Sequence, residues 1–130
     1  MNLFLNIQIT ERPEDVKFFD PIIATLKEKN IDSNFYDIDN HSDPLIMGYA
    51  SKLLSESDKK IILINTQIES NFSKLLSLLT NLLDNPEGIE IFIRGNNTKL
   101  EKMISILPHQ TFPETTHENE IIEGILDKFF

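Results

Sequence analysis

The sequence predicts an α/β fold: a single doubly wound, flavodoxin-like, three-layer sandwich that spans residues 1–130. Short apolar segments alternate with segments whose apolar residues recur at helical spacing, and only a few residues connect them. Strands in such a series run parallel and are joined by right-handed helical crossovers. Residues 59–65, KKIILIN, are apolar on both faces, which is typical of a central parallel strand. We therefore expect a mostly parallel sheet of about four or five strands in the order 2-1-3-4-5.

The first repeat begins with residues 3–9, LFLNIQI, in which alternate apolar residues share one face of a strand. Residues 14–18 are expected to form either a turn of helix ahead of the first long helix or the first half of a kinked helix. Pro21 cannot sit inside a helix, because it lacks an N–H and its ring clashes with the preceding turn. It therefore marks the first helical residue, with Asp20 as the N-cap. The expected apolar stripe of this helix comprises Phe19, Ile22, Ile23 and Leu26.

The second repeat joins a strand at residues 33–39, SNFYDID, to a helix that begins at Pro44. The strand has one polar face, which is characteristic of a sheet edge. Asp43 is the expected N-cap of the helix. The expected buried stripe of the helix comprises Ile46, Ala50 and Leu53.

The later repeats follow the same pattern. A helix over residues 72–83 follows the third strand, and residues 89–95 form a fourth strand that ends in glycine. Thr98 and Glu101 make a capping box for the next helix. Residues 109–112 are expected to form a short fifth strand, followed by a last helix. The expected apolar positions of the helix after the third strand are Phe72, Leu75, Leu76, Leu79, Leu82 and Leu83.

Composition excludes several classes of protein. The chain has no cysteine, so it holds no disulfide, thiolate zinc site or cysteine nucleophile. It carries 12 basic and 21 acidic residues, for a net charge of −9. Nucleic acid and anionic membranes are bound by rows of cations, so neither is an expected partner. No basic leader precedes the apolar N-terminus and no apolar run approaches the roughly 20 residues of a membrane span, which favours a cytoplasmic protein.

In a doubly wound sheet, ligands bind in the loops beyond the carboxyl ends of the strands. The loops at this edge, or rim, of the sheet are polar, so we expect them to bind a nucleotide, a sugar or a metal-bound anion. Residues 1–47 contain no glycine, so the chain lacks a glycine-rich phosphate loop, and no cofactor is expected. The candidate ligand-binding residues of this rim are Thr10, Glu11, Asp39, Asn65, Thr66 and Arg94.

Residues 37–44, DIDNHSDP, place an acid or an imidazole at every second position up to Asp43. The segment does not fit a calcium loop, because Ser42 stands where glycine is required and Gly48 stands where a bidentate glutamate is required. A site for a divalent ion is one interpretation of the segment. The favoured alternative is structural: an acidic edge strand, a turn and a helix cap. The candidate metal ligands are Asp39, His41 and Asp43.

Asn6 and Gln8 interrupt the second face of the first strand, which is expected to be central. They could donate hydrogen bonds to a ligand at the end of the strand. The favoured interpretation is that this face is thinly covered or that the two amides bond one another, because buried amides almost always find partners.

Two longer segments resemble the corresponding parts of Toll/interleukin-receptor (TIR) domains. Residues 4–32, FLNIQITERPEDVKFFDPIIATLKEKNID, carry a first strand, a polar loop, an amphipathic helix and the return to a second strand. Residues 49–71, YASKLLSESDKKIILINTQIESN, carry a helix, an apolar strand and a polar loop. The order of elements is similar over about residues 1–95. The resemblance implies a flavodoxin-like architecture and one of two family roles, cleavage of NAD or assembly with other proteins.

For the enzymatic role, the resemblance implies a glutamate in the helix after the third strand. The matching position falls near Leu76, which has no carboxylate, and Glu69 is the nearest acid. Glu69 is therefore the candidate catalytic residue of a degenerate NAD hydrolase. Because no catalytic motif is matched, the sequence favours a non-enzymatic protein-interaction or signalling module that binds a protein partner or a second copy of itself. A small-ligand domain and the degenerate hydrolase are the alternatives.

Overall fold

The structure, a computed structural model, describes residues 2–17, 21–29, 33–67, 70–84, 87–105, 110–111 and 123. Within these residues, five parallel strands form one sheet in the predicted order, β2-β1-β3-β4-β5. The predicted fifth strand is confirmed and is parallel to its neighbour. The strands are β1 (Asn2–Ile9), β2 (Asn34–Asp39), β3 (Lys59–Thr66), β4 (Ile89–Arg94) and β5 (Gln110–Thr111).

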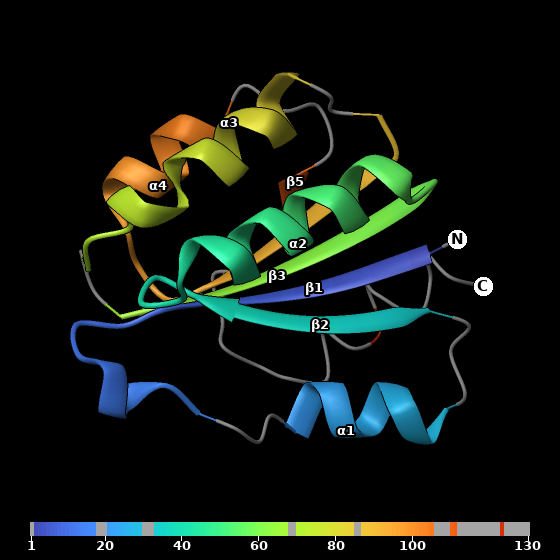
Figure 1. The fold of residues 1–130 in the computed structure, drawn as a ribbon. Coiled ribbons are helices and arrows are strands. Elements are labelled where there is room, and N and C mark those ends of the chain that lie inside the picture. Colours follow the sequence, from blue (N-terminus) through green and yellow to red (C-terminus); the bar gives the residue numbers. More distant parts are fainter. Residues whose placement is uncertain are drawn as a thin grey trace.

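Helices cover both faces of this sheet. Figure 1 shows α2, α3 and α4 on one face and α1 on the other, which is the predicted three-layer sandwich. In the described part of the chain, no helix is both long enough and apolar enough to cross a membrane. The helices are α1 (Pro21–Glu28), α2 (Pro44–Glu56), α3 (Leu76–Asp84) and α4 (Thr98–Ile104), with short 3-10 helices at Pro13–Asp15 and Ser73–Leu75.

Alternation along the strands divides the buried side chains between two cores. The core beneath α2, α3 and α4 takes one side of β1, as predicted, through Leu3, Leu5, Ile7 and Ile9. The core beneath α1 is smaller and contains Phe4, Leu26, Ile61, Leu63 and Phe92. Because β3 contributes to both cores, its apolar character on both faces is explained.

Among the side chains that the structure describes, which do not include that of Leu83, the predicted buried stripes of α2 and α3 are each wrong at one residue. Ile46 is 37% exposed and Leu76 is 44% exposed. On α2, Met47 packs against the core where Ile46 was predicted, together with Ala50, Leu53 and Leu54, because positions 46 and 47 are both compatible with helical spacing. On α3 the predicted helix begins instead with a 3-10 turn at Ser73–Leu75. Three residues per turn advance the chain further around the axis than an α-helix does, which turns residue 76 outward.

Two of the predicted helix starts are confirmed. α1 begins at Pro21, although its predicted cap, Asp20, lies outside the described residues. α2 begins at Pro44, and its predicted cap is confirmed because Asp43 Oδ1 accepts a hydrogen bond from the Ile46 N–H at 3.0 Å.

The predicted capping box of α4 is wrong by one residue. The N-cap is Asn97, not Thr98, and the Asn97 Oδ1 accepts a hydrogen bond from the Leu100 N–H at 3.3 Å. Threonine and asparagine are both good caps, so local preference does not decide between them. Asn97 is selected because its Nδ2 also donates to Thr66 Oγ1 at 3.2 Å and to the Ser70 carbonyl at 2.9 Å.

Candidate functional site

Three of the predicted rim residues lie in one row across the sheet. The strand register pairs Asp39 with Gln8, Gln8 with Asn65, and Asn65 with Arg94. Paired residues of parallel strands point toward the same face, so these four side chains share the α1 face of the sheet. The row runs from a carboxylate on the edge strand β2 to a guanidinium on β4.

The amides in this row are held by hydrogen bonds. Arg94 Nε donates to Asn65 Oδ1 at 2.5 Å, and Asn65 Nδ2 donates to Asn6 Oδ1 at 3.1 Å. Gln8 Nε2 donates to the Lys17 carbonyl at 2.7 Å, and Gln8 Oε1 accepts from the Lys17 N–H at 2.8 Å. Asn6 is 2% exposed and Gln8 is 9% exposed. The predicted alternatives, a thinly covered face or a bond between these two amides, are therefore wrong: both residues are buried, and Asn6 bonds Asn65 whereas Gln8 bonds the Lys17 backbone.

The side chain of Asn40, in the loop after β2, forms hydrogen bonds with the loop after β1. The Thr10 N–H donates to Asn40 Oδ1 at 3.0 Å, and Asn40 Nδ2 donates to the Thr10 carbonyl and to the Asn71 carbonyl, both at 2.7 Å. Thr10 Oγ1 in turn donates to the Arg12 carbonyl at 2.9 Å. Thr10 is among the residues predicted from the sequence, whereas Asn40 is not, since only the position of an amide directly after a strand could have signalled it.

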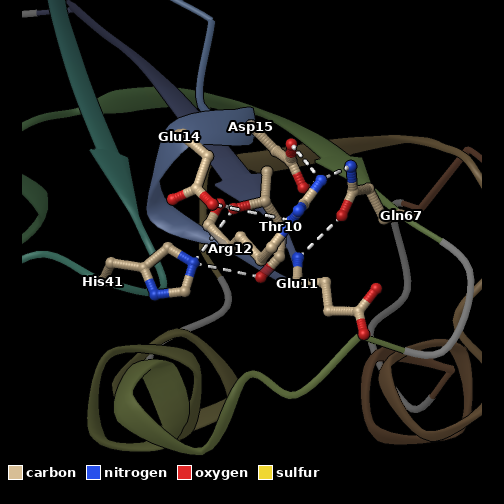
Figure 2. Close-up of polar contacts among 7 residues, drawn as sticks. All are labelled: Thr10, Glu11, Arg12, Glu14, Asp15, His41 and Gln67. Carbon is tan, nitrogen blue, oxygen red and sulfur yellow. Dashed lines mark hydrogen bonds and ion pairs between the residues drawn. The ribbon is translucent and has the colours of Figure 1, made fainter.

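The three predicted metal ligands are each held in a different contact. His41 Nε2 lies 3.0 Å from Thr10 Oγ1 and 3.1 Å from the Thr10 carbonyl oxygen (Figure 2). Asp39 Oδ1 accepts from the His41 N–H at 2.7 Å, and Asp43 caps α2. Among the residues that the structure describes, no group of three His, Asp or Glu side chains is arranged to hold a metal ion.

At the rim, Glu11 contacts its neighbours through its backbone N–H and not through its carboxylate. Gln67 Oε1 accepts from the Glu11 N–H at 2.7 Å, and Gln67 Nε2 donates to Asp15 Oδ2 at 3.4 Å. Figure 2 shows the Glu11 carboxylate pointing away from this cluster. Arg12 forms two ion pairs: its Nε lies 3.7 Å from Glu14 Oε1 and its Nη2 lies 3.6 Å from Asp15 Oδ1. Exposed pairs of this kind stabilise a fold by about 1 kcal/mol at most.

Thr66 is set apart from Asn65, because neighbouring strand residues point to opposite faces. It is 9% exposed, and its Oγ1 donates to the Gln67 carbonyl at 2.9 Å. Gly95, in the loop after β4, passes close to it with a φ of +108°, and a Cβ at this glycine would lie 2.0 Å from the Thr66 carbonyl oxygen. The candidate catalytic residue, Glu69, lies outside the described residues, so its role stays a prediction.

Apolar side chains are exposed at the start of α2. Leu45 is 85% exposed, Tyr49 51% and Ile46 37%. The ring centroid of Tyr49 lies 5.2 Å from that of Tyr36 on β2, in an edge-on arrangement. Burial raises the pKa of Tyr36 above its ordinary 10.0, with smaller contributions from Tyr49 and Asp43. Residues three and four apart share one side of a helix, so these side chains form one surface. The α2 patch comprises Tyr36, Leu45, Ile46 and Tyr49.

No family model and no curated protein matches the sequence. The structure is similar to a TIR domain in the crystal structure of the RPS4 and RRS1 TIR domain heterodimer. The TM-score is 0.55 and the sequence identity is 14%, over 98% of this chain and 99% of that chain. At this identity the likeness is one of fold. The described chain therefore has the flavodoxin-like α/β fold of a TIR domain, and the predicted resemblance to TIR domains is confirmed at that level.

Proposed function

We propose that this chain is a protein-interaction module with a role in signalling, and that it binds its partner through the α2 patch. The observation that carries the proposal is the exposure of Leu45, at 85%, next to Tyr49 and Ile46 on the same helix. Contiguous apolar side chains on a surface mark interaction sites, and buried aromatic anchors dominate binding energies. Covering a leucine or an aromatic side chain contributes roughly 1.5–3 kcal/mol.

The state of the rim supports binding at α2 over binding at the strand ends. The hydroxyls of Thr10 and Thr66 are both bonded within the protein, and both residues are less than a tenth exposed. A ligand that used these groups would have to replace existing hydrogen bonds, which lowers the net gain. The similar TIR domain forms a heterodimer, which also supports a protein partner here.

A double variant, Leu45→Asp with Tyr49→Asp, tests the proposal. Both side chains are exposed, so the fold should survive, whereas a partner that covers them would have to desolvate two charges. Affinity capture from an extract of the native host, together with light scattering for self-association, should show a complex with the wild-type protein that the variant loses. The matched control is Leu76→Asp, on exposed α3 surface. A wild-type chain that stays monomeric and captures no partner would reject the proposal, as would equal capture by the double variant.

The row of Asp39, Asn65 and Arg94 favours a second candidate, a small anion or nucleotide site on the rim. Ligand at a hundred times its dissociation constant raises the free energy of unfolding by about 2.7 kcal/mol. A thermal-shift panel of nucleotides, sugar phosphates and divalent ions should then raise the melting temperature of the wild-type protein and leave that of Arg94→Ala unchanged. No shift with any of these compounds removes this candidate.

A further inference from the structure

A groove runs between α2 and α3. Two cavities lie along it, of about 650 Å³ and about 460 Å³, and Ser51 lines both. The larger cavity adjoins the start of α2, at Pro44 and Gly48, and the smaller one adjoins its end, at Ser55. The groove therefore follows most of the length of α2.

Small side chains create the space. On α2 the residues that line the cavities include Gly48, Ser51 and Ser55, and on α3 they include Ser77. A Cβ placed on Gly48 would meet no atom within 4 Å. Beneath these small residues lie apolar side chains that line the same cavities: Met47, Leu54, Leu78 and Leu82.

The charged residues differ between the two ends of the groove. Lys74 lines the larger cavity, where the carboxylate of Asp43 is turned to cap α2 and the imidazole of His41 is bonded to Thr10. Asp84 and Glu87 line the smaller cavity with Lys60, which leaves an excess of negative charge there. Within the described residues, no ion pair of 4 Å or less joins any of the side chains of Lys74, Lys60, Asp84 and Glu87.

We infer that this groove binds an extended segment of a partner protein whose middle carries an apolar side chain, whose one end is acidic and whose other end is basic. The inference goes beyond the proposed function, because none of the residues of the α2 patch lines this groove. The apolar anchor lies over Met47 and Leu78, the acidic end meets Lys74, and the basic end meets Asp84 and Glu87. Complementary charges at the two ends set the direction of the segment.

The length of the groove agrees with a short extended segment. The 13 residues of α2 rise about 20 Å. An extended chain covers that distance in about six residues. A second copy of this chain is a poor occupant, because each copy carries a net charge of −9.

Selection from a random peptide library tests the inference. Peptides enriched on the wild-type protein should carry an apolar residue between an acidic and a basic end. Their binding should fall at least about tenfold on Gly48→Phe, which fills the open space, and should be retained on Gly48→Ala and on Leu76→Asp, which does not line the groove. A synthetic copy with its acidic and basic residues exchanged should bind about tenfold more weakly, because both ends then meet like charge. Circular dichroism and melting of each variant verify that it is folded.

The outcomes separate this inference from the proposed function. Enriched peptides that bind Gly48→Phe as well as the wild-type protein but fail on Leu45→Asp would overturn the groove as a binding site and leave the α2 patch standing. Enriched peptides without the charge polarity, or with unchanged affinity after charge exchange, would overturn the stated partner chemistry. A selection that enriches no peptide dependent on Gly48 would also overturn the inference.

Discussion

One side-chain amide, that of Asn40, bonds both backbone groups of Thr10: Oδ1 accepts from the Thr10 N–H at 3.0 Å and Nδ2 donates to the Thr10 carbonyl at 2.7 Å. The Asn40 N–H also donates to the Gln8 carbonyl at 3.1 Å. The amide thus continues the pairing of β1 and β2 one step beyond the end of the sheet. Because Nδ2 also reaches the Asn71 carbonyl, a single residue joins three rim loops.

Asn40→Ala should destabilise the fold by about 2–4 kcal/mol, because it removes three hydrogen bonds and leaves the buried Thr10 N–H without its partner. Urea denaturation measures the loss. Asn34→Ala, on exposed surface at the start of β2, is the matched control and should change stability by less than about 0.5 kcal/mol. Equal effects of the two substitutions would show that the amide of Asn40 does not hold the rim.

Replacement by alanine should change the stability of the protein strongly at one leucine of α2 and very little at another. Leu54 is 5% exposed and packs in the larger core, so Leu54→Ala should cost about 2–5 kcal/mol of unfolding free energy. Leu45 is 85% exposed, so Leu45→Ala should change stability by less than about 0.5 kcal/mol while weakening partner binding. Denaturation of both variants provides the comparison. A large loss of stability in Leu45→Ala would show that this side chain belongs to the core.

Replacement of two glycines by alanine should change the stability of the protein in opposite directions. Gly95→Ala places a Cβ against the Thr66 carbonyl at a φ of +108°, and we expect a loss of about 2–3 kcal/mol. Gly48→Ala meets open space inside a helix, so it should raise stability by about 0.5–1 kcal/mol. Melting temperatures of the two variants give the test, and stabilisation by Gly95→Ala would contradict the observed approach of the loops after β3 and β4.

Stability at alkaline pH should depend on Tyr36. Its folded pKa is raised above 10.0 by burial, by Tyr49 and by Asp43, so the folded state holds the phenol proton more tightly than the unfolded state does. The stability that this provides is present below pH 10 and is lost as the pH rises through the folded pKa. Tyr36→Phe should therefore lose less stability than the wild-type protein above pH 10, as measured by melting across that range. An identical pH dependence of the two proteins would contradict the shift.

Sequence alone predicts the sheet order, because the apolar segments, the short connections and the two-sided apolar character of β3 all constrain the same topology. It also predicts the caps that depend on local chemistry, such as Asp43 ahead of Pro44. The predictions of helix caps and buried faces are wrong where two neighbouring residues are equally suitable locally and tertiary packing determines which of them is used. Asn97 and not Thr98 is the N-cap of α4, because the Asn97 side chain also forms hydrogen bonds with Thr66 and Ser70. Ile46 is exposed because another face of α2 packs on the sheet.

The candidate site was predicted less well than the fold. The sequence selects Asp39, Asn65 and Arg94 one strand at a time, whereas the register that aligns them is a property of the assembled sheet. The groove was missed for a similar reason. Gly48 and Ser77 appear unremarkable in the sequence, and they form a cavity only because α2 and α3 are neighbours.

Site-specific photo-crosslinking tests the central claim most directly, since it asks which surface touches the partner. A photoreactive amino acid replaces Leu45 in one protein and Glu11, on the exposed rim, in another. If the partner binds through the α2 patch, position 45 should give a discrete protein adduct that Tyr49→Asp abolishes, and position 11 should give none. An adduct from position 11 that is insensitive to Tyr49→Asp, with none from position 45, would contradict binding through α2.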